Sequence, residues 1–292
     1  MTSPALAIAR ASAADWVELT KPRITTMVVF TTLVGFVTAS APVDLALLVA
    51  TLVGTALVAA GAAVLNQVIE RRTDALMLRT RERPLPAGRV SPLDAAVFGA
   101  ALSGLGLGVL GWLAGSLAGA VAAATLGSYL GLYTPLKRRT SLATLIGAVP
   151  GALPPVIGWT AARGALDGGA FVLFAILFFW QVPHFLAIAW MYREDYARGG
   201  FPMLPVLDRE GTLTARQAVV HSLALLAVSL LPTAAGLAGG LYVAGAFVLG
   251  AVLVLFALRL ALTRDVVAAR GLFVASVLYL PALCSVLLAA RV

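Results

Sequence analysis

The sequence predicts an all-α, polytopic membrane protein with nine transmembrane helices. Three observations support this fold class. First, 61% of the 292 residues are hydrophobic and only 12% are charged, whereas about a quarter of the residues of a soluble domain are charged. Second, the mean hydropathy is +0.97. Third, long runs without Asp, Glu, Lys or Arg recur along the chain, and basic residues gather in every second connection between helices.

The apolar runs define the helices in order. A helix needs about 20 apolar residues to cross the hydrocarbon core of a bilayer, so two runs of 42 residues each are expected to hold a pair of helices. Residues 111–116 and 236–240 contain glycines that favour the tight turn within each pair. The runs, which together give nine helices, span residues 24–43, 45–69, 95–136 (a pair), 140–162, 168–192, 217–258 (a pair) and 271–290.

The basic residues predict the orientation of the helices, because Lys and Arg in short loops favour the cytoplasmic side. Nineteen of the twenty-one basic residues fall on one side, and only Arg163 and Arg291 fall on the other. This distribution places the N-terminus inside and the C-terminus outside. The net charge of +8 is then explained by an inner surface that faces anionic lipid, and no nucleic-acid partner is expected.

The whole chain, residues 1–292, is interpreted as a single integral-membrane domain. Residues 1–20 lack an apolar stretch of signal-peptide length and are interpreted as an inside-facing tail. Cys284 is the only cysteine, which excludes an intrachain disulfide. Nineteen arginines against two lysines, together with frequent alanine, favour a bacterial inner membrane as the location.

Asn66, Glu70 and Asp74 are the most informative residues of the chain. They stand four positions apart at the end of the second apolar run. On a helix each such step turns by about 40°, so the three side chains form one slowly drifting stripe at the membrane edge. Their oxygens suit a hard cation such as Mg²⁺. The alternative is a helix end whose acids simply pair with neighbouring arginines.

Arginines follow this stripe or interleave with it, and guanidinium groups bind phosphate groups well. Acidic metal ligands and anion-binding groups in one short segment favour a Mg²⁺-bound phosphate ester. The six arginines are Arg71, Arg72, Arg79, Arg81, Arg83 and Arg89.

Two further segments on the inner side carry charge. Glu194 and Asp195 follow the sixth helix, which suggests a second acidic rim that faces the first across one cavity, although a solvated loop is the simpler interpretation. Lys137 and Arg138 follow the fourth helix. Such cations commonly anchor a helix at the inner surface, and they can also stabilise the negative charge of a departing diphosphate.

His184 follows Pro183 inside the sixth helix. Proline removes a backbone donor and is expected to kink the helix, and a histidine within the membrane needs a cavity or a partner. Three roles fit His184: a ligand of haem iron, an acid or base, and a hydrogen-bonded packing residue. His221 has fewer polar neighbours in the sequence and is interpreted as structural.

Together these strings resemble the UbiA superfamily of intramembrane prenyltransferases, and within it the branch of protohaem IX farnesyltransferases. The acidic stripe is typical of the superfamily, whereas the Lys-Arg-Arg-Thr, Pro-His-Phe and Asp-Tyr to Met-Leu-Pro strings narrow the resemblance to the haem branch. Two positions depart from it: Glu70 stands where many members have Asp, and Ala143 where the haem branch often has Asn. The matching strings are residues 18–25, 66–85, 133–140, 146–147, 151–159, 180–185, 195–200 and 202–205.

The resemblance implies a UbiA-type bundle with a central cavity open to the inside face. It implies transfer of a farnesyl group from farnesyl diphosphate to a vinyl group of haem b, which yields haem O and diphosphate for the assembly of haem-copper oxidases. Haem b is then a substrate rather than a permanent cofactor. The implied partners are these two substrates, the lipid bilayer, and a haem A synthase or another oxidase-assembly protein.

The resemblance also implies roles for individual residues. Mg²⁺ would be bound by Asn66, Glu70, Asp74 and, from the opposite rim, Asp195. His184 is the candidate for holding the haem. The catalytic set is Asn66, Glu70, Asp74, Lys137 and Arg138, and the substrate-binding set is Arg79, Arg83, Tyr133, Asp195, Tyr196 and Arg198.

Two other functions remain open at this point. Prenylation of an aromatic quinone precursor would use the same metal site. A transporter of organic anions is a different class, but transporters commonly place charged groups and broken helices in the middle of the membrane. Here every apolar run is free of Asp, Glu, Lys and Arg, and the acids lie at one edge.

Overall fold

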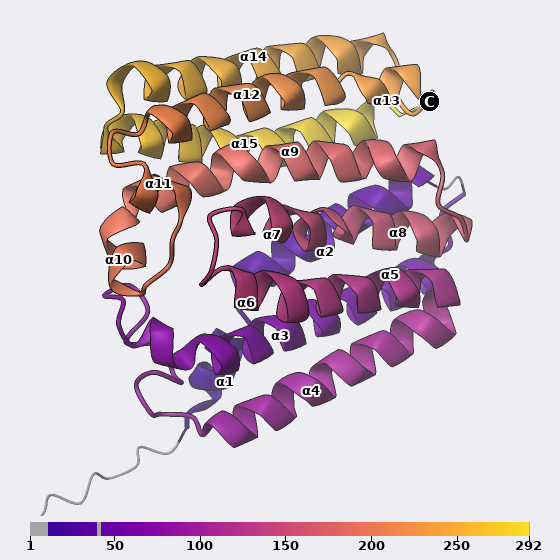
Figure 1. The fold of residues 1–292 in the computed structure, drawn as a ribbon. Coiled ribbons are helices and arrows are strands. Elements are labelled where there is room, and N and C mark those ends of the chain that lie inside the picture. Colours follow the sequence, from indigo (N-terminus) through magenta and orange to yellow (C-terminus); the bar gives the residue numbers. More distant parts are fainter. Residues whose placement is uncertain (1–10, 40–41, 292) are drawn as a thin grey trace, which may run out of the picture.

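The computed structural model describes residues 11–39 and 42–291 as a bundle of helices (Figure 1). Within these residues nine helical spans are long and apolar enough to cross a membrane, which confirms the predicted number. Residues 1–10, the first half of the predicted tail, lie outside the described residues. The helices are α1 (Ala13–Leu19), α2 (Pro22–Ala39), α3 (Leu45–Asp74), α4 (Pro92–Val109), α5 (Ser116–Gly127), α6 (Thr134–Leu136), α7 (Ala143–Ala152), α8 (Pro154–Arg163), α9 (Gly168–Met191), α10 (Arg193–Arg198), α11 (Leu204–Leu207), α12 (Thr212–Val228), α13 (Leu231–Ala234), α14 (Gly240–Thr263) and α15 (Val266–Ala289).

Both predicted turns within the long apolar runs are present. Gly115 separates the third span from the fourth with φ of 107°, a value that only glycine adopts readily. The seventh span ends at Ala234 and the eighth begins at Gly240, and Gly236 between them has φ of 70°. Two π-helical turns, Leu110–Ala114 and Ser128–Tyr133, complete the third and fourth spans.

The second span is longer than the apolar run that predicts it. That run ends at residue 69, whereas α3 continues to Asp74. Glu70, Thr73 and Asp74 are buried in this extension. The helix can continue past the apolar run because other segments supply partners for these polar side chains.

Two glycines bring α2 and α8 into close contact. A Cβ atom built on Gly35 would lie 2.0 Å from the carbonyl oxygen of Pro155, and one built on Gly158 would lie 2.0 Å from that of Thr32. Small residues at a helix crossing let two backbones approach closely. The α2–α8 contact therefore depends on the absence of side chains at these two positions.

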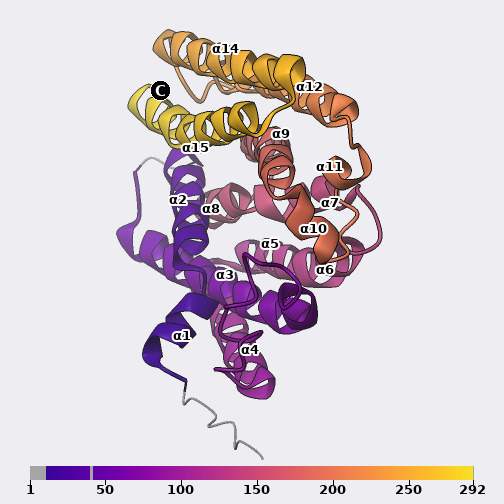
Figure 2. The same ribbon diagram turned by 90° about the vertical axis from the view of Figure 1, so that its left-hand side faces the viewer.

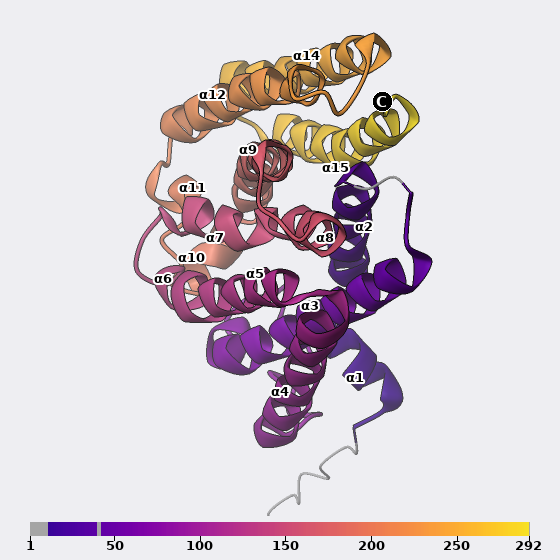
Figure 3. The same ribbon diagram turned by 90° about the vertical axis from the view of Figure 1, so that its right-hand side faces the viewer.

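The two long connections of the chain lie at the same end of the bundle. Residues 75–91, after α3, and the segment with α10 and α11 meet at the left of Figure 1 and face the viewer in Figure 2. The opposite end, which faces the viewer in Figure 3, carries shorter connections and the C-terminus. This arrangement agrees with the prediction that the polar segments gather on one side.

The described part of the predicted tail contains α1, which packs against the connection that follows α3. Ser12 caps α1, and the carboxylate of Asp15 accepts a hydrogen bond of 2.7 Å from Nε of Arg89. This hydrogen bond and those from Ser12 lower the pKa of Asp15 to about 2. Leu19 at the end of α1 is fully buried. Residues 12–19 therefore pack against the connection that follows α3.

Candidate functional site

Asn66, Glu70 and Asp74 lie on the last turns of α3, as their spacing predicts, and all three are buried. Their exposed fractions are 3%, 5% and 1%. A buried carboxylate is costly unless it is paired and hydrogen-bonded. The partners of these side chains therefore define the site.

Each member of the stripe contacts a cation from a different segment. Lys21, between α1 and α2, donates from Nζ to Oδ1 of Asn66 at 3.3 Å. Lys137, after α6, donates to both carboxylate oxygens of Glu70 at 3.2 and 3.3 Å. Arg83 forms an ion pair of 2.9 Å with Asp74. Three separate segments thus place positive charge along the acidic stripe.

The amide of Asn66 is held in one orientation. Its Nδ2 donates to Oγ1 of Thr134 at 3.2 Å, and that hydroxyl donates in turn to the carbonyl oxygen of Tyr129 at 2.8 Å. Since Lys21 can only donate, Oδ1 of Asn66 must face its ammonium group. The amide oxygen therefore points toward the cations of the site.

Lys21 is a site residue that the sequence analysis did not assign. It has φ of 47°, which is uncommon for a residue with a side chain, and such strained backbone conformations cluster at functional sites. Burial, with added repulsion from Arg83, lowers the pKa of Lys21 to about 8. One signal in the sequence points to it. Lys21 and Lys137 are the only lysines of the chain, and both contact the stripe.

Asp195 joins the two long connections. Its Oδ1 accepts a hydrogen bond of 2.9 Å from the backbone N–H of Leu78, and its Oδ2 accepts one of 3.0 Å from that of Arg79. Arg198 forms an ion pair of 3.0 Å with the same carboxylate. Although burial opposes ionisation, the two backbone donors hold the pKa of Asp195 below its usual range.

The predicted role of Asp195 as a metal ligand stays a prediction, and the contacts of its carboxylate give it a structural role as well. Both carboxylate oxygens accept hydrogen bonds from the protein, so Asp195 positions the segment that follows the stripe. The predicted substrate-binding residue Arg198 forms an ion pair with Asp195. The sequence could not show this, because the donors are backbone groups more than a hundred residues away.

Apolar and aromatic contacts strengthen the same junction. Met77, Ala189, Phe201 and Met203 form a small buried cluster between the connections. The ammonium group of Lys137 lies 4.6 Å from the ring centroid of Phe201, a distance at which a cation is attracted to an aromatic face. The cluster thus also helps to place Lys137.

The predicted aromatic residues lie beside these cations. The guanidinium carbon of Arg79 is 5.0 Å from the ring centroid of Tyr192 and 5.8 Å from that of Tyr196. The ring centroid of Tyr133 lies 5.8 Å from Nζ of Lys137. Arg138 is exposed, and its guanidinium group has no hydrogen-bond or ion-pair partner in the described part of the chain. The structure therefore brings Lys137, and not Arg138, to the stripe.

His184 lies apart from the stripe, where α9 packs against α15. Its Nδ1 is 2.8 Å from Oγ of Ser276, and its ring stacks on Trp180 with centroids 4.9 Å apart. Ser276 was not assigned from the sequence. A serine in an apolar helix gives no signal by itself, and its contact with His184 joins residues 92 positions apart.

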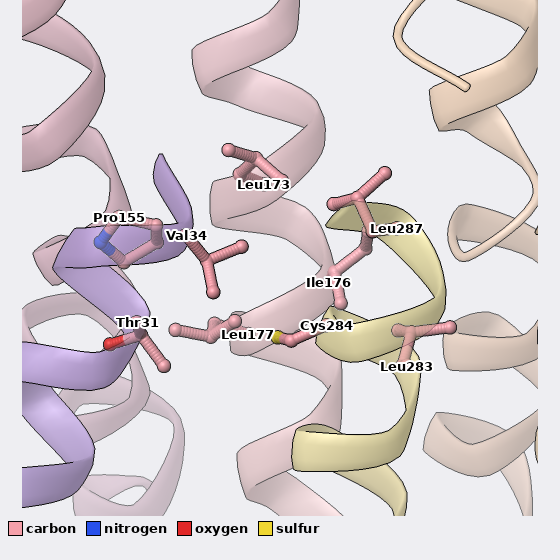
Figure 4. A pocket seen from close by; sticks show the side chains of 9 residues that line it. All are labelled: Thr31, Val34, Pro155, Leu173, Ile176, Leu177, Leu283, Cys284 and Leu287. Atoms are coloured by element: carbon pink, nitrogen blue, oxygen red, sulfur yellow. The ribbon is translucent and has the colours of Figure 1, made fainter. Parts of the chain in front are cut away.

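An apolar cavity lies further along the same faces of α9 and α15. Figure 4 shows it between these helices, α2 and the start of α8. It shares no residue with the stripe. Its lining residues are Thr31, Val34, Pro155, Leu173, Ile176, Leu177, Leu283, Cys284 and Leu287.

The donor set of the stripe fits a hard divalent cation. Asn66, Glu70 and Asp74 offer only oxygen atoms, the ligands that Mg²⁺ prefers, and Mg²⁺ usually takes one or two carboxylates together with water and phosphate oxygens. No group of three or more His, Cys, Asp or Glu side chains in the described residues forms a complete metal site.

The chain matches a known protein family over most of its length. The model of the UbiA prenyltransferase family matches residues 28–283. The chain is 49% identical to a protoheme IX farnesyltransferase of Solibacter usitatus, with 95% of this chain and 98% of the relative covered. It is 44% identical to the enzyme of the same name from Opitutus terrae, with 96% and 94% covered.

Solved structures show the same fold at low sequence identity. A digeranylgeranylglyceryl phosphate synthase superposes with a TM-score of 0.79 at 15% identity, over 95% of this chain and 97% of its own. A UbiA homologue from Aeropyrum pernix gives 0.68 at 19% identity, over 89% and 96%. A UbiA homologue from Archaeoglobus fulgidus, solved with GPP and Mg²⁺, gives 0.61 at 14% identity, over 94% and 99%.

Proposed function

The chain belongs to the UbiA prenyltransferase family, and from this premise we propose that it transfers a farnesyl group from farnesyl diphosphate to a vinyl group of haem b. The products are haem O and diphosphate, for use in haem-copper oxidases. The acceptor is proposed because relatives at 44 to 49% identity over nearly the whole chain are protoheme IX farnesyltransferases.

The observation that carries the proposal is the acidic stripe with its three opposing cations. Lys21, Arg83 and Lys137 hold more positive charge than Glu70 and Asp74 can neutralise, counted as three charges against two. An unbalanced cluster at the membrane edge favours an anion. A diphosphate suits it, because it can be bound by the cations and share a metal ion with the acids.

Mg²⁺ is proposed to be held by Asn66, Glu70 and Asp74 when the donor is bound, and it would make the diphosphate a better leaving group. The residues of the chain do the remaining work. Arg79 and Arg83 neutralise charge on the diphosphate from the 75–91 connection. Lys137 is proposed to neutralise charge on the diphosphate from the end of the fourth span. Arg138, which is exposed, is proposed to act with it. Asp195 keeps the connection in place.

In the proposed reaction the farnesyl group moves from an oxygen of the diphosphate to a carbon of the haem vinyl group. The bond between the allylic carbon and the diphosphate oxygen breaks, and its electrons leave with diphosphate. The vinyl π electrons of haem b form the new carbon–carbon bond. Water adds to the electron-deficient vinyl carbon and loses a proton, which gives the hydroxyl group of haem O. The apolar helices exclude bulk water from the allylic cation.

The haem is proposed to be held by His184, since imidazole is a common axial ligand of haem iron. His184 lies seven residues before the end of α9, about 10 Å along the helix from the connection that carries Asp195. α9 thus runs from this histidine to the connection that carries Asp195. Tyr133 and Tyr196 are proposed to line the space near the diphosphate.

The chain is proposed to work as a single integral-membrane domain, residues 1–292, in a bacterial inner membrane. The distribution of nineteen basic residues supports an N-terminus in the cytoplasm and a C-terminus outside. The stripe then faces the cytoplasmic side. A haem A synthase or another oxidase-assembly protein is the proposed recipient of the product.

Product analysis tests the proposal directly. Purified protein is incubated with farnesyl diphosphate and Mg²⁺, and with either haem b or 4-hydroxybenzoate, and the products are identified by chromatography and mass spectrometry. We expect haem O from the first mixture and no prenylated product from the second. Prenylated benzoate without haem O would overturn the proposed acceptor and favour quinone biosynthesis.

A further inference from the structure

The surroundings of His184 are built around a single residue of α15. Nδ1 of His184 is 2.8 Å from Oγ of Ser276, and the indole N–H of Trp180 donates to the backbone oxygen of Ser276 at 2.7 Å. Trp180 stacks on the imidazole from one turn earlier in α9, with 21° between the planes. The ring of Phe273 has its centroid 5.1 Å from that of the imidazole. Both helices therefore fix the imidazole ring.

The hydroxyl of Ser276 determines which nitrogen of His184 carries hydrogen. Its Oγ donates to the carbonyl oxygen of Phe273 at 2.7 Å. A carbonyl oxygen can only accept, and a hydroxyl has one hydrogen to give. In its contact with His184 the hydroxyl must therefore accept, so Nδ1 of the neutral ring carries the hydrogen.

The other ring nitrogen is then an unprotonated acceptor. In neutral imidazole one nitrogen donates while the other holds a free lone pair. Nε2 of His184 has no hydrogen-bond partner in residues 11–39 and 42–291, and it is not among the fully enclosed polar atoms of these residues. A polar atom within the membrane favours a partner, and Nε2 is accessible to one from outside the chain.

We propose that Ser276 is a positioning residue for haem: it holds His184 as the Nδ1–H tautomer, which leaves Nε2 free to bind the haem iron. The inference rests on the proposed function, because haem b is the acceptor proposed there. A histidine that binds a metal commonly donates its other N–H to an oxygen, which fixes the ring and makes the ligand more basic. Trp180 assists by holding the plane of the ring.

Equilibrium binding of haem b without farnesyl diphosphate tests the assignment. Haem is titrated into detergent-purified wild-type protein and into the variants Ser276→Ala, Ser276→Thr and His184→Ala. The readouts are the dissociation constant and the iron–histidine stretching band of the ferrous complex in resonance Raman spectra. Ser222→Ala is the matched control, since Ser222 is also a buried helix serine but its hydroxyl has no partner in the described residues.

We expect Ser276→Ala to bind haem about tenfold or more weakly, as is typical when such a supporting partner is lost, with its iron–histidine band at lower frequency. Ser276→Thr and Ser222→Ala should resemble the wild type, and His184→Ala should lack the band. Binding of farnesyl diphosphate should be unchanged in Ser276→Ala, which also shows that this variant is folded.

Two results would overturn the inference: a wild-type dissociation constant and band in Ser276→Ala, or a wild-type band in His184→Ala. A different result would contradict the proposed function but not the assignment of Ser276. A wild-type protein that shows the iron–histidine band, with the expected response to Ser276→Ala, but forms no haem O from farnesyl diphosphate contradicts the reaction. It leaves the assignment of Ser276 and His184 supported.

Discussion

At the scale of single residues, the protein places charges on an apolar scaffold and pairs each buried acid. Asp15, Glu70, Asp74 and Asp195 are buried, and each has a basic partner within 3.2 Å. Breaking a buried pair leaves an uncompensated charge, whereas an exposed pair contributes little. Substitutions at the buried acids are thus expected to have large effects, each with its own readout.

Asp74→Asn should strongly reduce turnover and leave the fold intact. The amide keeps the size of the side chain but loses the charge that is proposed to bind Mg²⁺, and Arg83 opposite it is partly exposed and can stay hydrated. We expect kcat to fall by about 10²- to 10³-fold, as for the loss of other electrostatic groups in active sites. Full Mg²⁺-dependent activity would remove Asp74 from the site. Glu82→Gln is the control, because Glu82 is an exposed acid on the same connection.

Lys21 should make the affinity for farnesyl diphosphate depend on pH. Its pKa in the folded protein is lowered to about 8, so the ammonium group is present below this pH and is lost as the pH rises through it. If Lys21 binds the diphosphate, KM should be constant below about pH 8 and rise above it by up to tenfold per pH unit.

Two variants separate Lys21 from other titrating groups. Lys21→Met should show a high KM without this inflection, and Lys21→Arg should keep a low KM at higher pH because guanidinium stays protonated. KM is measured from about pH 6.5 to 9.5. The same inflection in Lys21→Met as in the wild type would assign the titration to another group.

At the scale of elements, the α2–α8 crossing holds the first span against the middle of the bundle. Gly158→Ala should destabilise the protein, because its Cβ atom would overlap the backbone oxygen of Thr32 at 2.0 Å and the helices would have to separate. The expected cost is about 1–3 kcal/mol of unfolding free energy. Thermal unfolding in detergent measures it. Gly104→Ala is the control, since Gly104 in α4 has open space around it, and a loss of stability equal to that of Gly158→Ala would contradict this account.

The two long connections should separate in Asp195→Asn. The amide has one acceptor oxygen where the backbone N–H groups of Leu78 and Arg79 need two. A buried donor without a partner costs about 1–3 kcal/mol. We expect faster tryptic cleavage after the exposed residues Arg79 and Arg81, and a higher KM for farnesyl diphosphate.

The matched control for this variant is Glu194→Gln, because Glu194 is the exposed neighbour of Asp195. Trypsin resistance in Asp195→Asn equal to that of the wild type would show that the connections are held by other contacts. The effect should not vary near neutral pH. The lowered pKa of Asp195 means that its contribution is present above the ordinary pKa of aspartate and is lost only as the pH falls through the lower, folded-state value.

At the scale of the whole molecule, the bundle separates an apolar body from one polar end. The two long connections of the candidate site lie at that end (Figures 1 and 2), and only two of the twenty-one basic residues, Arg163 and Arg291, fall on the opposite side. The charge distribution predicts that the polar end faces the cytoplasm. Alkaline phosphatase, which is active only outside the inner membrane, should therefore be active when fused after the C-terminus or within residues 164–167, and inactive when fused after Arg139. The reverse pattern would invert the assigned orientation.

The sequence by itself determined the membrane class, the nine spans, both glycine turns and the stripe on α3. These properties are local. Hydropathy sums over about 20 neighbouring residues, and a spacing of four places side chains on one helical face whatever surrounds the helix. The resemblance to the UbiA superfamily likewise rests on short strings, and the comparisons confirm it.

Only the tertiary structure decided the partner of each side chain. Lys21 meets Asn66 across 45 residues, Lys137 meets Glu70 across 67, and Asp195 meets the backbone of Leu78 across 117. Ser276 meets His184 across 92. These contacts arise from the packing of separate helices, and a local sequence pattern contains no information about which helices become neighbours. For that reason the stripe was visible from the sequence, whereas the cations that oppose it and the serine that orients His184 were not.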